Sequence, residues 1–399
     1  MNTENILNHY EKHNIIQMKD LNLYNKTLLI RVDFNVPIKN QKILFDTRIK
    51  STIPTINFAL KKKSKIILMS HLGRPKEGNS EKCFSMFPIF EYLKKFFYKN
   101  NVYFSNNLEI KKMKIGDIRI LENVRFNIGE KKNDIELSKK YANLCDIFVM
   151  DAFASAHRKE ASTVGAGKFS KIACAGPLFI KEITALKKSL KNPKRPMTAI
   201  VGGSKISTKF NILKKLSVIA DTVIVGGGIA NTFLAIDNDI GKSLHEKKFI
   251  PLAKKLRDTN KILIPVDSRV GTNFSKNAIA IQKKPNSIKK NEEIMDIGDI
   301  SIRNIKNIIK RSKTILWNGP LGVFEFPNFC IGTKKLAQYI SKSNAFSIAG
   351  GGETLSVIKI FKIQNNISYI STGGGAFLEF VEGKKLPVIK MLEKKYTNK

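Results

Sequence analysis

The chain has 399 residues, of which 42% are hydrophobic and 9% aromatic, a composition typical of folded globular domains and not of disordered chains. This length predicts two or three domains, and the absence of any run of about 18 apolar residues excludes a membrane-spanning helix. Lysine and arginine number 70 against 33 aspartates and glutamates, so the net charge of +37 favours anionic partners: nucleic acid, lipid surfaces or phosphorylated metabolites.

The N-terminal stretch and the cysteines indicate the compartment. Residues 1–17 include Glu4 and Glu11 and no arginine, which fits neither a signal peptide nor an arginine-rich transit peptide. We therefore expect a cytoplasmic protein. The four cysteines have no CxxC spacing and no histidine at metal-ligand spacing, and they predict reduced thiols.

Short apolar, β-branched runs recur along the whole chain, separated by segments long enough for a helix. Near-continuous apolar strands of this kind are typical of parallel sheets with helices on both faces, so the predicted fold class is α/β. The runs are TLLIRVDF (27–34), KIILMS (65–70), DIRILEN (117–123), DIFVMD (146–151), TAIVGG (198–203), DTVIVGGG (221–228), KILIPVD (261–267), KTILWNG (313–319), AFSIAGGG (345–352) and ISYISTGGG (367–375).

A helical pattern at 182–197 lies between two halves of different character and is stopped by Pro193 and Pro196. We predict two Rossmann-like lobes, each a parallel sheet flanked by helices, with a cleft between them. The expected domains are an N-terminal lobe at 1–185, an interdomain helix and hinge at 186–200, and a C-terminal lobe at 201–399 whose last residues return toward the first lobe.

Polar groups follow the strands of the first half, whereas glycines follow those of the second. Ligands of open α/β sheets bind beyond the carboxyl ends of the strands, so both sets lie where a ligand is expected. Several guanidinium groups that converge would hold a small polyanion through paired hydrogen bonds, although any single arginine more often forms a surface ion pair. The arginines of this kind are Arg31, Arg48, Arg74, Arg125 and Arg158, accompanied by His71.

The glycine turns of the second half are GGSKISTK (202–209), GGGIANTF (226–233), WNGPLGVFE (317–325), GGGET (350–354) and STGGGA (371–376). Each is expected to open a helix directly after a strand, where bare N–H groups can face phosphate oxygens. One such turn is more simply a tight connection, but five in one lobe favour a nucleotide site. No P-loop, dinucleotide fingerprint or protein-kinase catalytic loop is present.

In order, the stretches RVDFNVP, SHLGRP, LENVRF, DAFASAHR, VGGSKISTK, VGGGIANTF, WNGPLGVFEFPNF, IAGGGET and ISTGGGAFLEF resemble the successive signatures of the phosphoglycerate kinase family. The resemblance runs from about residue 16 to about residue 393. It implies a glycolytic, cytoplasmic, monomeric kinase that transfers a phosphoryl group reversibly between 1,3-bisphosphoglycerate and ADP. The products are 3-phosphoglycerate and ATP, magnesium is required, and the transfer is direct and in line after hinge-bending closure of the lobes.

The resemblance also implies the site residues. In the N-terminal lobe the substrate-binding residues would be Asp33, Asn35, Arg48, His71, Leu72, Gly73, Arg74, Arg125 and Arg158. In the C-terminal lobe the nucleotide-binding residues would be Lys209, Glu325, Gly351, Gly352, Glu353 and Thr354, with Glu353 as the metal ligand. The catalytic residues would be Arg48 and Lys209, with Lys205 supporting Lys209.

This sequence departs from the family pattern at several places. Glu353 stands where the family usually has Asp, and one extra methylene moves a carboxylate by about 1.5 Å, which matters for the tight octahedral geometry of Mg²⁺. Ala154 stands where the family usually has Gly and would be strained if that position needs a positive φ. Glu160 and Val164 occupy places where related sequences often carry His.

Two other functions would each explain part of the sequence. A basic nucleic-acid-binding protein on the same scaffold would explain the charge, but the lysines are spread evenly along the chain and no RNA-binding signature accompanies them. A nucleotide-dependent dehydrogenase would need the GxGxxG start and an acidic residue about 20 positions later, which are lacking. We therefore expect small-molecule substrates, no membrane partner and no nucleic-acid partner.

Overall fold

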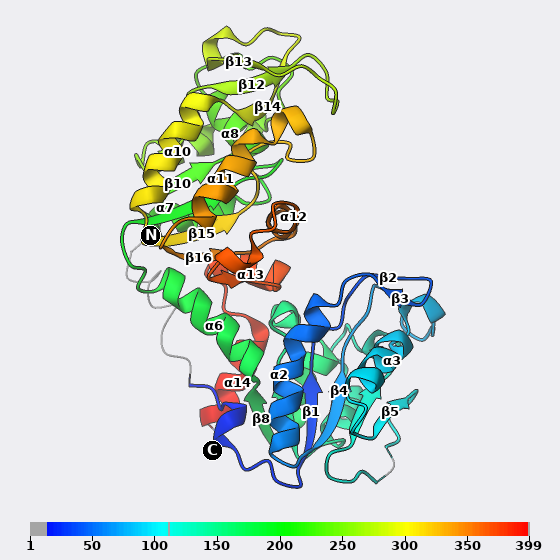
Figure 1. Ribbon diagram of the computed structural model, residues 1–399. Helices are drawn as coiled ribbons and strands as arrows, with labels where there is room; N and C mark the ends of the chain where they lie inside the picture. The colour runs from blue at the N-terminus through cyan, green and yellow to red at the C-terminus, as the bar shows by residue number, and fades with distance from the viewer. Residues whose placement is uncertain (1–13, 111, 398–399) are drawn as a thin grey trace. The chain divides into compact units, whose positions relative to one another are not determined.

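The computed structural model describes residues 14–110 and 112–397, which divide into two compact units (Figure 1). The N-terminal unit comprises residues 14–184 together with 385–397, and the C-terminal unit comprises residues 185–384. Residues 1–13, on which the expected absence of a leader peptide largely rests, lie outside the described residues. The predicted α/β class with two lobes is confirmed.

A six-stranded sheet forms the centre of the N-terminal unit, and all its neighbouring strands are parallel. In spatial order the strands are β5 (Val102–Ser105), β6 (Ile118–Leu121), β4 (Lys65–Met69), β1 (Thr27–Arg31), β7 (Ile147–Met150) and β8 (Ile172–Ala175). The interior strand β7 is buried at every position, as a parallel strand covered on both faces must be. A two-residue hairpin, β2 (Ile38–Lys39) and β3 (Lys42–Ile43), lies outside this sheet.

Helices cover both faces of that sheet. Figure 1 shows α2 (Thr47–Lys61) across one face of β1 and β4, where it shares a hydrophobic core with α3 (Phe87–Phe96). Successive strand side chains point to opposite faces, so Phe148 of β7 faces away from that core and lies against Gly167 of α5 (Ala166–Phe169). The other helices of this unit are α4 (Ile135–Ala142), the π-helix η6 (Ala161–Gly165) and α14 (Pro387–Thr397), which packs on β8.

The C-terminal unit also has a six-stranded parallel sheet, with a second, antiparallel sheet that the sequence did not predict. The parallel strands in spatial order are β11 (Ile262–Leu263), β10 (Thr222–Val225), β9 (Met197–Val201), β15 (Thr314–Asn318), β16 (Phe346–Ala349) and β17 (Tyr369–Ile370). The antiparallel strands are β13 (Ile281–Lys283), β12 (Ser268–Gly271) and β14 (Glu293–Ile297).

The helices of this unit are α7 (Phe210–Ile219), α8 (Gly227–Leu234), α9 (Ile250–Arg257), α10 (Asp299–Arg311), α11 (Ile331–Ser341), α12 (Gly352–Ile360) and α13 (Gly374–Val381). Apolar residues of α10, α11 and α12 pack on the parallel sheet around the fully buried Trp317. Figure 1 shows α10 and α11 side by side over this sheet.

The expected helix at 182–197 differs from the observed one. Helix α6 spans Pro177–Leu190, so it begins earlier and ends before Pro193. Residues 197–200, which fall within the expected hinge segment, belong to β9 at the centre of the C-terminal sheet, in line with the apolar run at 198–203. Met197–Val201 is buried at every position, which is typical of a parallel strand covered on both faces and not of a hinge.

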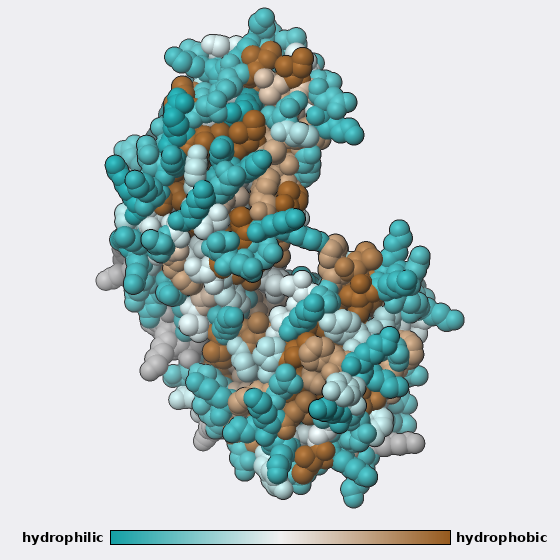
Figure 2. All heavy atoms as spheres, viewed as in Figure 1, coloured by the Kyte–Doolittle hydropathy of each residue, from teal (hydrophilic) through white to brown (hydrophobic). Residues whose placement is uncertain are grey.

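Hydrophilic side chains are spread over the visible faces of both units, with no single stripe (Figure 2). Within the described part of the chain, every helix is too short or too polar to span a bilayer. All four cysteines are free thiols, and burial raises the pKa of Cys145 to about 12.

Candidate functional site

The predicted substrate residues of the N-terminal unit follow four neighbouring strands. Asp33 and Asn35 come after β1, His71 after β4, Arg125 after β6 and Arg158 after β7. Because β6, β4, β1 and β7 are adjacent and parallel, their carboxyl ends meet at one edge of the sheet. The sheet order therefore brings together residues that lie more than 120 positions apart in the sequence.

Arg48 lies in the first turn of α2 and contacts the loop after β1. Its Nη1 is 3.0 Å from Oδ2 of Asp33 and donates a hydrogen bond of 3.0 Å to the carbonyl oxygen of Asn35. The side-chain oxygen of Asn35 accepts a hydrogen bond of 2.9 Å from the backbone N–H of Gly73. These bonds tie Arg48 to the loops that follow β1 and β4.

The SHLGRP loop after β4 is held by a buried amide. The side chain of Asn123 accepts from the N–H of Leu72 at 3.1 Å and donates to its carbonyl oxygen at 2.8 Å. Gly73 has a φ of +61°, and a Cβ there would be 2.3 Å from the ring of Phe84, so only glycine fits. Arg74 is exposed, and no hydrogen bond or ion pair within the described residues joins it to this cluster.

Arg125 and Arg158 converge on one carboxylate, that of Glu160. Arg125 donates to the carbonyl oxygen of Gly73 at 2.5 Å, and its Nη2 is 3.4 Å from Oε1 of Glu160. Nη1 of Arg158 is 3.7 Å from the same oxygen. Sequence reasoning noted Glu160 only as a departure from a family pattern and gave it no role. Only its contact with two predicted substrate residues shows that it belongs to the cluster.

A buried polar network lies next to this cluster. Arg31 is fully buried, and its guanidinium contacts Nδ1 of His71 at 3.2 Å and donates to Oγ of Ser162 at 3.0 Å. The Ser162 hydroxyl in turn donates to Oε1 of Glu130 at 2.5 Å. Guanidinium can only donate, so Nδ1 of His71 accepts and Nε2 carries the proton of the neutral ring.

Burial decides the charges of that network. Burial, followed by the positive charge of Arg31, holds the pKa of His71 well below its ordinary value, which keeps the ring neutral. Burial also raises the pKa of Glu130 to about 7, against the opposing effect of hydrogen bonds from Ser162 and the charge of Arg31. Nothing in the sequence near Glu130 distinguishes it from a surface glutamate, so only the tertiary structure identifies it.

In the C-terminal unit most of the glycine turns are explained by close backbone contact. A Cβ on Gly202 would be 1.7 Å from the carbonyl oxygen of Pro320, and one on Gly228 would be 2.0 Å from that of Ser204. Only α8, α12 and α13 begin within a glycine turn. The turn at 202–209 leads directly into α7, whose N-cap is Lys209, whereas the turn at 317–325 leads into a loop, which corrects the expectation that all five open a helix. Close packing of the backbone therefore explains several glycines that the sequence analysis attributes to nucleotide binding.

The turn at 350–354 differs at one position, because its backbone is open at Gly352, whereas a Cβ on Gly350 would be 2.7 Å from the ring of Phe377 and one on Gly351 would be 2.6 Å from Nδ2 of Asn318. Gly351 has a φ of +100° and caps α12, and a Cβ on Gly352 would meet nothing within 4 Å. Thr354 is fully buried and its Oγ1 accepts from the N–H of Gly319 at 2.7 Å. The start of α12 is thus fixed to the loop after β15, and its first N–H groups are available to an anion.

Lys209 and Glu353 both lie close to Gly203. A Cβ on Gly203 would be 3.3 Å from Nζ of Lys209 and 3.7 Å from Oε2 of Glu353. Nζ of Lys209 donates to the carbonyl oxygen of Gly202 at 2.6 Å. Burial lowers the pKa of Lys209, and the charge of Glu353 partly opposes that shift. A cation, a carboxylate and a helix N-terminus therefore meet at the ends of β9 and β16.

Two of the residues predicted to bind the nucleotide lie outside this group. Lys205 and Glu325 are both exposed, and no hydrogen bond or ion pair in the described ranges joins either to Lys209 or Glu353. No set of three or more histidine, cysteine, aspartate or glutamate side chains among the described residues is arranged to hold a metal ion. Glu353 is therefore a single carboxylate and not part of a protein metal cage. Ala154 lies in a 3₁₀ helix without a positive φ, so its methyl group is unstrained.

Comparison with known proteins gives consistent matches. The family model for phosphoglycerate kinase matches residues 18–384. The phosphoglycerate kinase of Buchnera aphidicola subsp. Schizaphis graminum is 66% identical over 386 residues, which cover 96% of this chain and 99% of that protein. That of Buchnera aphidicola subsp. Baizongia pistaciae is 60% identical over 383 residues, which cover 96% and 98%.

Solved structures show the same likeness. The structure of phosphoglycerate kinase from Coxiella burnetii matches with a TM-score of 0.91 at 46% identity and covers 95% of this chain and 99% of that one. The crystal structure of the Pyrococcus horikoshii OT3 phosphoglycerate kinase matches with a TM-score of 0.81 at 31% identity, covering 96% and 100%.

Proposed function

Because this chain belongs to the phosphoglycerate kinase family, we propose that the two residue clusters described above are the two halves of its active site. The protein is a glycolytic kinase that moves a phosphoryl group between 1,3-bisphosphoglycerate and ADP, with 3-phosphoglycerate and ATP on the other side of the equilibrium. The observation that carries the assignment of residues is the chain of contacts from Arg48 through Asn35 and Gly73 to Arg125.

The N-terminal cluster binds the triose. Guanidinium groups of Arg125 and Arg158 pair with its phosphate, since arginine offers two parallel donors to such oxygens. Neutral His71 donates from Nε2 to an oxygen of the substrate. Asp33 and Asn35 accept hydrogen bonds from its hydroxyl group. Arg74, which is exposed and unattached to the cluster, joins when the substrate is bound.

Arg48 acts on the phosphoryl group during transfer. The acceptor is a carboxylate, which is already ionised at neutral pH, so no general base is needed. The barrier instead comes from charge on the moving group and from alignment of attacking and leaving oxygens. Arg48 neutralises part of that charge, and its contacts with Asp33 and Asn35 hold its guanidinium in position before the substrate arrives.

The nucleotide phosphates bind at the start of α12. The open backbone at Gly352 and the first N–H groups of the helix suit phosphate oxygens. Lys209 contributes a cation, with Lys205 as a second, more distant one, and Glu325 contacts the ribose. The desolvated ammonium of Lys209 acts more strongly on phosphate than an exposed one would.

The residues fit magnesium brought by the nucleotide. Magnesium is often held by one or two carboxylates together with phosphate oxygens and waters, so the exposed Glu353 beside Lys209 suffices and no protein cage is required. When bound, magnesium neutralises charge on the phosphates during transfer. Glu353 is the residue that would hold it.

Transfer is direct and in line, with hinge-bending around residues 182–205 bringing the acceptor carboxylate to the terminal phosphate. Such closure also keeps water from the phosphoryl group. The protein acts as a cytoplasmic monomer on small molecules. The nucleic-acid alternative is disfavoured because the lysines are spread along the whole chain without an RNA-binding signature, and retention of RNA at about 150 mM salt would revive it.

The decisive assay is ADP production from ATP by the purified chain. Turnover is expected to require both 3-phosphoglycerate and Mg²⁺ and to fall at least about hundredfold in Arg48→Ala and in Lys209→Ala. Arg303→Ala and Lys214→Ala are matched controls, since both side chains are exposed on helices of the C-terminal unit and should leave turnover unchanged. Turnover that persists in the first two variants would refute the residue assignment.

A further inference from the structure

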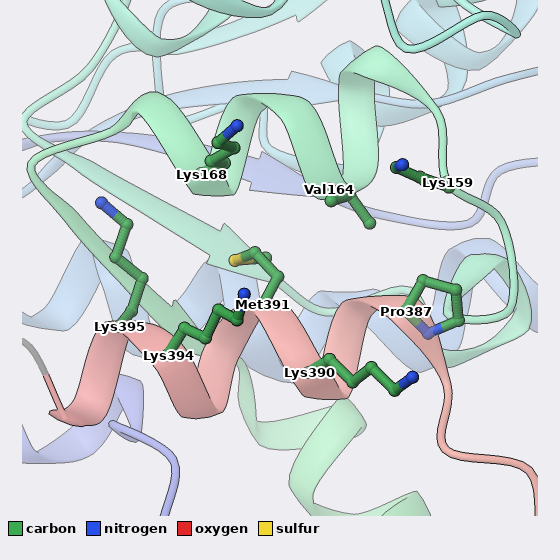
Figure 3. A pocket seen from close by; sticks show the side chains of 8 residues that line it. All are labelled: Lys159, Val164, Lys168, Pro387, Lys390, Met391, Lys394 and Lys395. Atoms are coloured by element: carbon green, nitrogen blue, oxygen red, sulfur yellow. The ribbon is translucent and has the colours of Figure 1, made fainter.

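A hollow of about 660 Å³ lies in the N-terminal unit between α14 and the segment that runs from Lys159 to α5 (Figure 3). None of its lining residues was predicted to bind substrate or nucleotide. Five of them are lysines: Lys159, Lys168, Lys390, Lys394 and Lys395. We call this hollow the lysine pocket.

The lysine pocket is built from two walls. One face of α14 supplies Pro387, Lys390, Met391 and Lys394, whose spacing of three, four and seven residues places them in one row along the helix. The facing wall is the π-helix η6 with α5, from which Val164 and Lys168 extend (Figure 3). The lysines thus come from both walls.

The charge of the lysine pocket is uncompensated. No aspartate or glutamate lines it, and none of its five lysines forms an ion pair with a carboxylate in the described part of the chain. Two other large hollows of the same unit carry charges of both signs: one is lined by Asp46, Glu91 and Lys95, the other by Asp134, Glu136 and Lys140. A basic composition alone would add lysines to every hollow but would not remove the acids from this one.

The floor of the lysine pocket is fixed. A Cβ on Gly167 would be 2.3 Å from the methyl carbon of Met391, so α5 and α14 are in direct contact below the lysines. At the last turn of α14, Nζ of Lys395 donates to the carbonyl oxygen of Ser170 at 2.5 Å. The N–H of Val388 bonds to the carbonyl oxygen of Ala156 at 3.2 Å at the other end. The lysines therefore stand on a preformed surface.

We propose that the lysine pocket binds a small polyphosphate, either an inorganic chain or the phosphates of a nucleotide. Lysine ammonium groups are compact point charges that bind phosphate oxygens without a fixed orientation, which suits several adjacent phosphates. The volume lies within the range of about 300 to 1,000 Å³ that small-molecule sites occupy. No carboxylate within the described residues neutralises these ammonium groups, so the repulsion among them decreases when such an anion binds.

Calorimetric titration of the full chain with tripolyphosphate tests the proposal, in excess 3-phosphoglycerate so that the proposed triose site is occupied. The double variant Lys390→Gln/Lys394→Gln is expected to weaken binding about tenfold. Lys26→Gln/Lys132→Gln removes the same charge from exposed positions of the same unit outside the pocket and should weaken it less than about twofold. Equal weakening in both doubles would mean diffuse electrostatic attraction and would overturn the proposal, as would absence of binding.

The methyl group of Met391 gives an independent measurement of where the anion binds. In protein labelled at its methionine methyl groups, the Met391 signal, assigned through Met391→Leu, should move on addition of tripolyphosphate and not in the Lys390→Gln/Lys394→Gln variant. An unmoved signal would place the anion elsewhere and refute the site. If ATP moves the Met391 signal further and at lower concentration than tripolyphosphate does, the ligand of the pocket is a nucleotide. If tripolyphosphate moves it further and at lower concentration, the ligand is an inorganic chain. Neither readout depends on kinase activity, so failure here and failure of the proposed function are distinguishable.

Discussion

Arg125 and Glu160 form a buried ion pair, with Nη2 of the arginine 3.4 Å from Oε1 of the glutamate. Arg158 reaches the same oxygen at 3.7 Å. Two guanidinium groups assigned to the triose phosphate are therefore already partnered by a carboxylate of the protein. An arriving phosphate competes with that carboxylate for the arginines and is repelled by its charge.

Replacement of Glu160 by Gln is expected to strengthen substrate binding. The amide keeps the shape and one acceptor oxygen, so it still caps the π-helix, but it removes the repelling charge. We expect KM for 3-phosphoglycerate to fall about three- to tenfold, with kcat nearly unchanged, in steady-state assays at fixed ATP. Glu136→Gln, an exposed change on α4, is the control. A rise in KM would show instead that Glu160 orients the arginines for binding.

Glu130 makes the stability of the N-terminal unit depend on pH. Its pKa is about 7 in the folded protein, raised by burial from the ordinary 4.5, so the folded state binds more protons than the unfolded state between these values. The stabilisation is complete below about pH 4.5 and is lost as pH rises through 7. In the Glu130→Gln variant this loss is absent.

The measurement is the free energy of unfolding of wild type and Glu130→Gln across about pH 5 to 8. Wild type should lose up to about 3 kcal/mol relative to the variant over this range. His71, whose folded pKa is lowered, contributes with the opposite sign, and buried Asp151 and Asp296 with the same sign. These contributions cancel in the difference between the two proteins. Parallel profiles would contradict the assignment.

Glu353 is expected to tolerate shortening but not loss of charge. Glu353→Gln removes the carboxylate proposed for magnesium, so kcat should fall at least about tenfold and the Mg²⁺ concentration for half-maximal rate should rise. The carboxylate also raises the pKa of Lys209, so the same variant should shift the alkaline limb of the rate profile to lower pH. Glu353→Asp should keep measurable activity. Normal Mg²⁺ dependence in Glu353→Gln would exclude this residue as the metal ligand.

Two glycines of the C-terminal unit should respond in opposite ways to the same change. Gly202→Ala places a methyl group 1.7 Å from the carbonyl oxygen of Pro320 and should cost about 3 kcal/mol of stability, measured by chemical denaturation. Gly352→Ala meets open space and should leave stability unchanged. It should nevertheless raise KM for ATP, because the methyl group occupies space proposed for a phosphate. An unchanged KM would separate the 350–354 loop from nucleotide binding.

Much of the fold follows from local sequence. Each of the ten predicted apolar runs contains a strand, because a strand buried on both faces needs a continuous run of β-branched and apolar residues. The sequence missed the edge strands β5 and β8 of the N-terminal sheet, the hairpin strands β2 and β3, and the antiparallel strands β12, β13 and β14, all of which are short. Strands β12 and β14 also include charged residues, Arg269 and Glu293, so no apolar run marks them. The predicted helix at 182–197 begins too late, because the apolar pattern of α6 extends back to Pro177. It also ends too late, because its end was placed at the prolines and not at Leu190.

The sequence by itself determined which residue types stand at the strand ends: the arginines, His71, the glycine turns and Glu353. Only the tertiary structure decided which of them meet. The order β6, β4, β1, β7 brings Arg125, Arg48 and Arg158 to one edge and buries Arg31 and Glu130 beside them, while Arg74, Lys205 and Glu325 remain apart. Helix α14, in the segment expected to return toward the first lobe, packs on β8 in the N-terminal unit, and its packing there creates the lysine pocket. The physical reason is that strand identity is set by neighbouring residues, whereas burial, pairing and pKa depend on contacts between segments far apart in the chain.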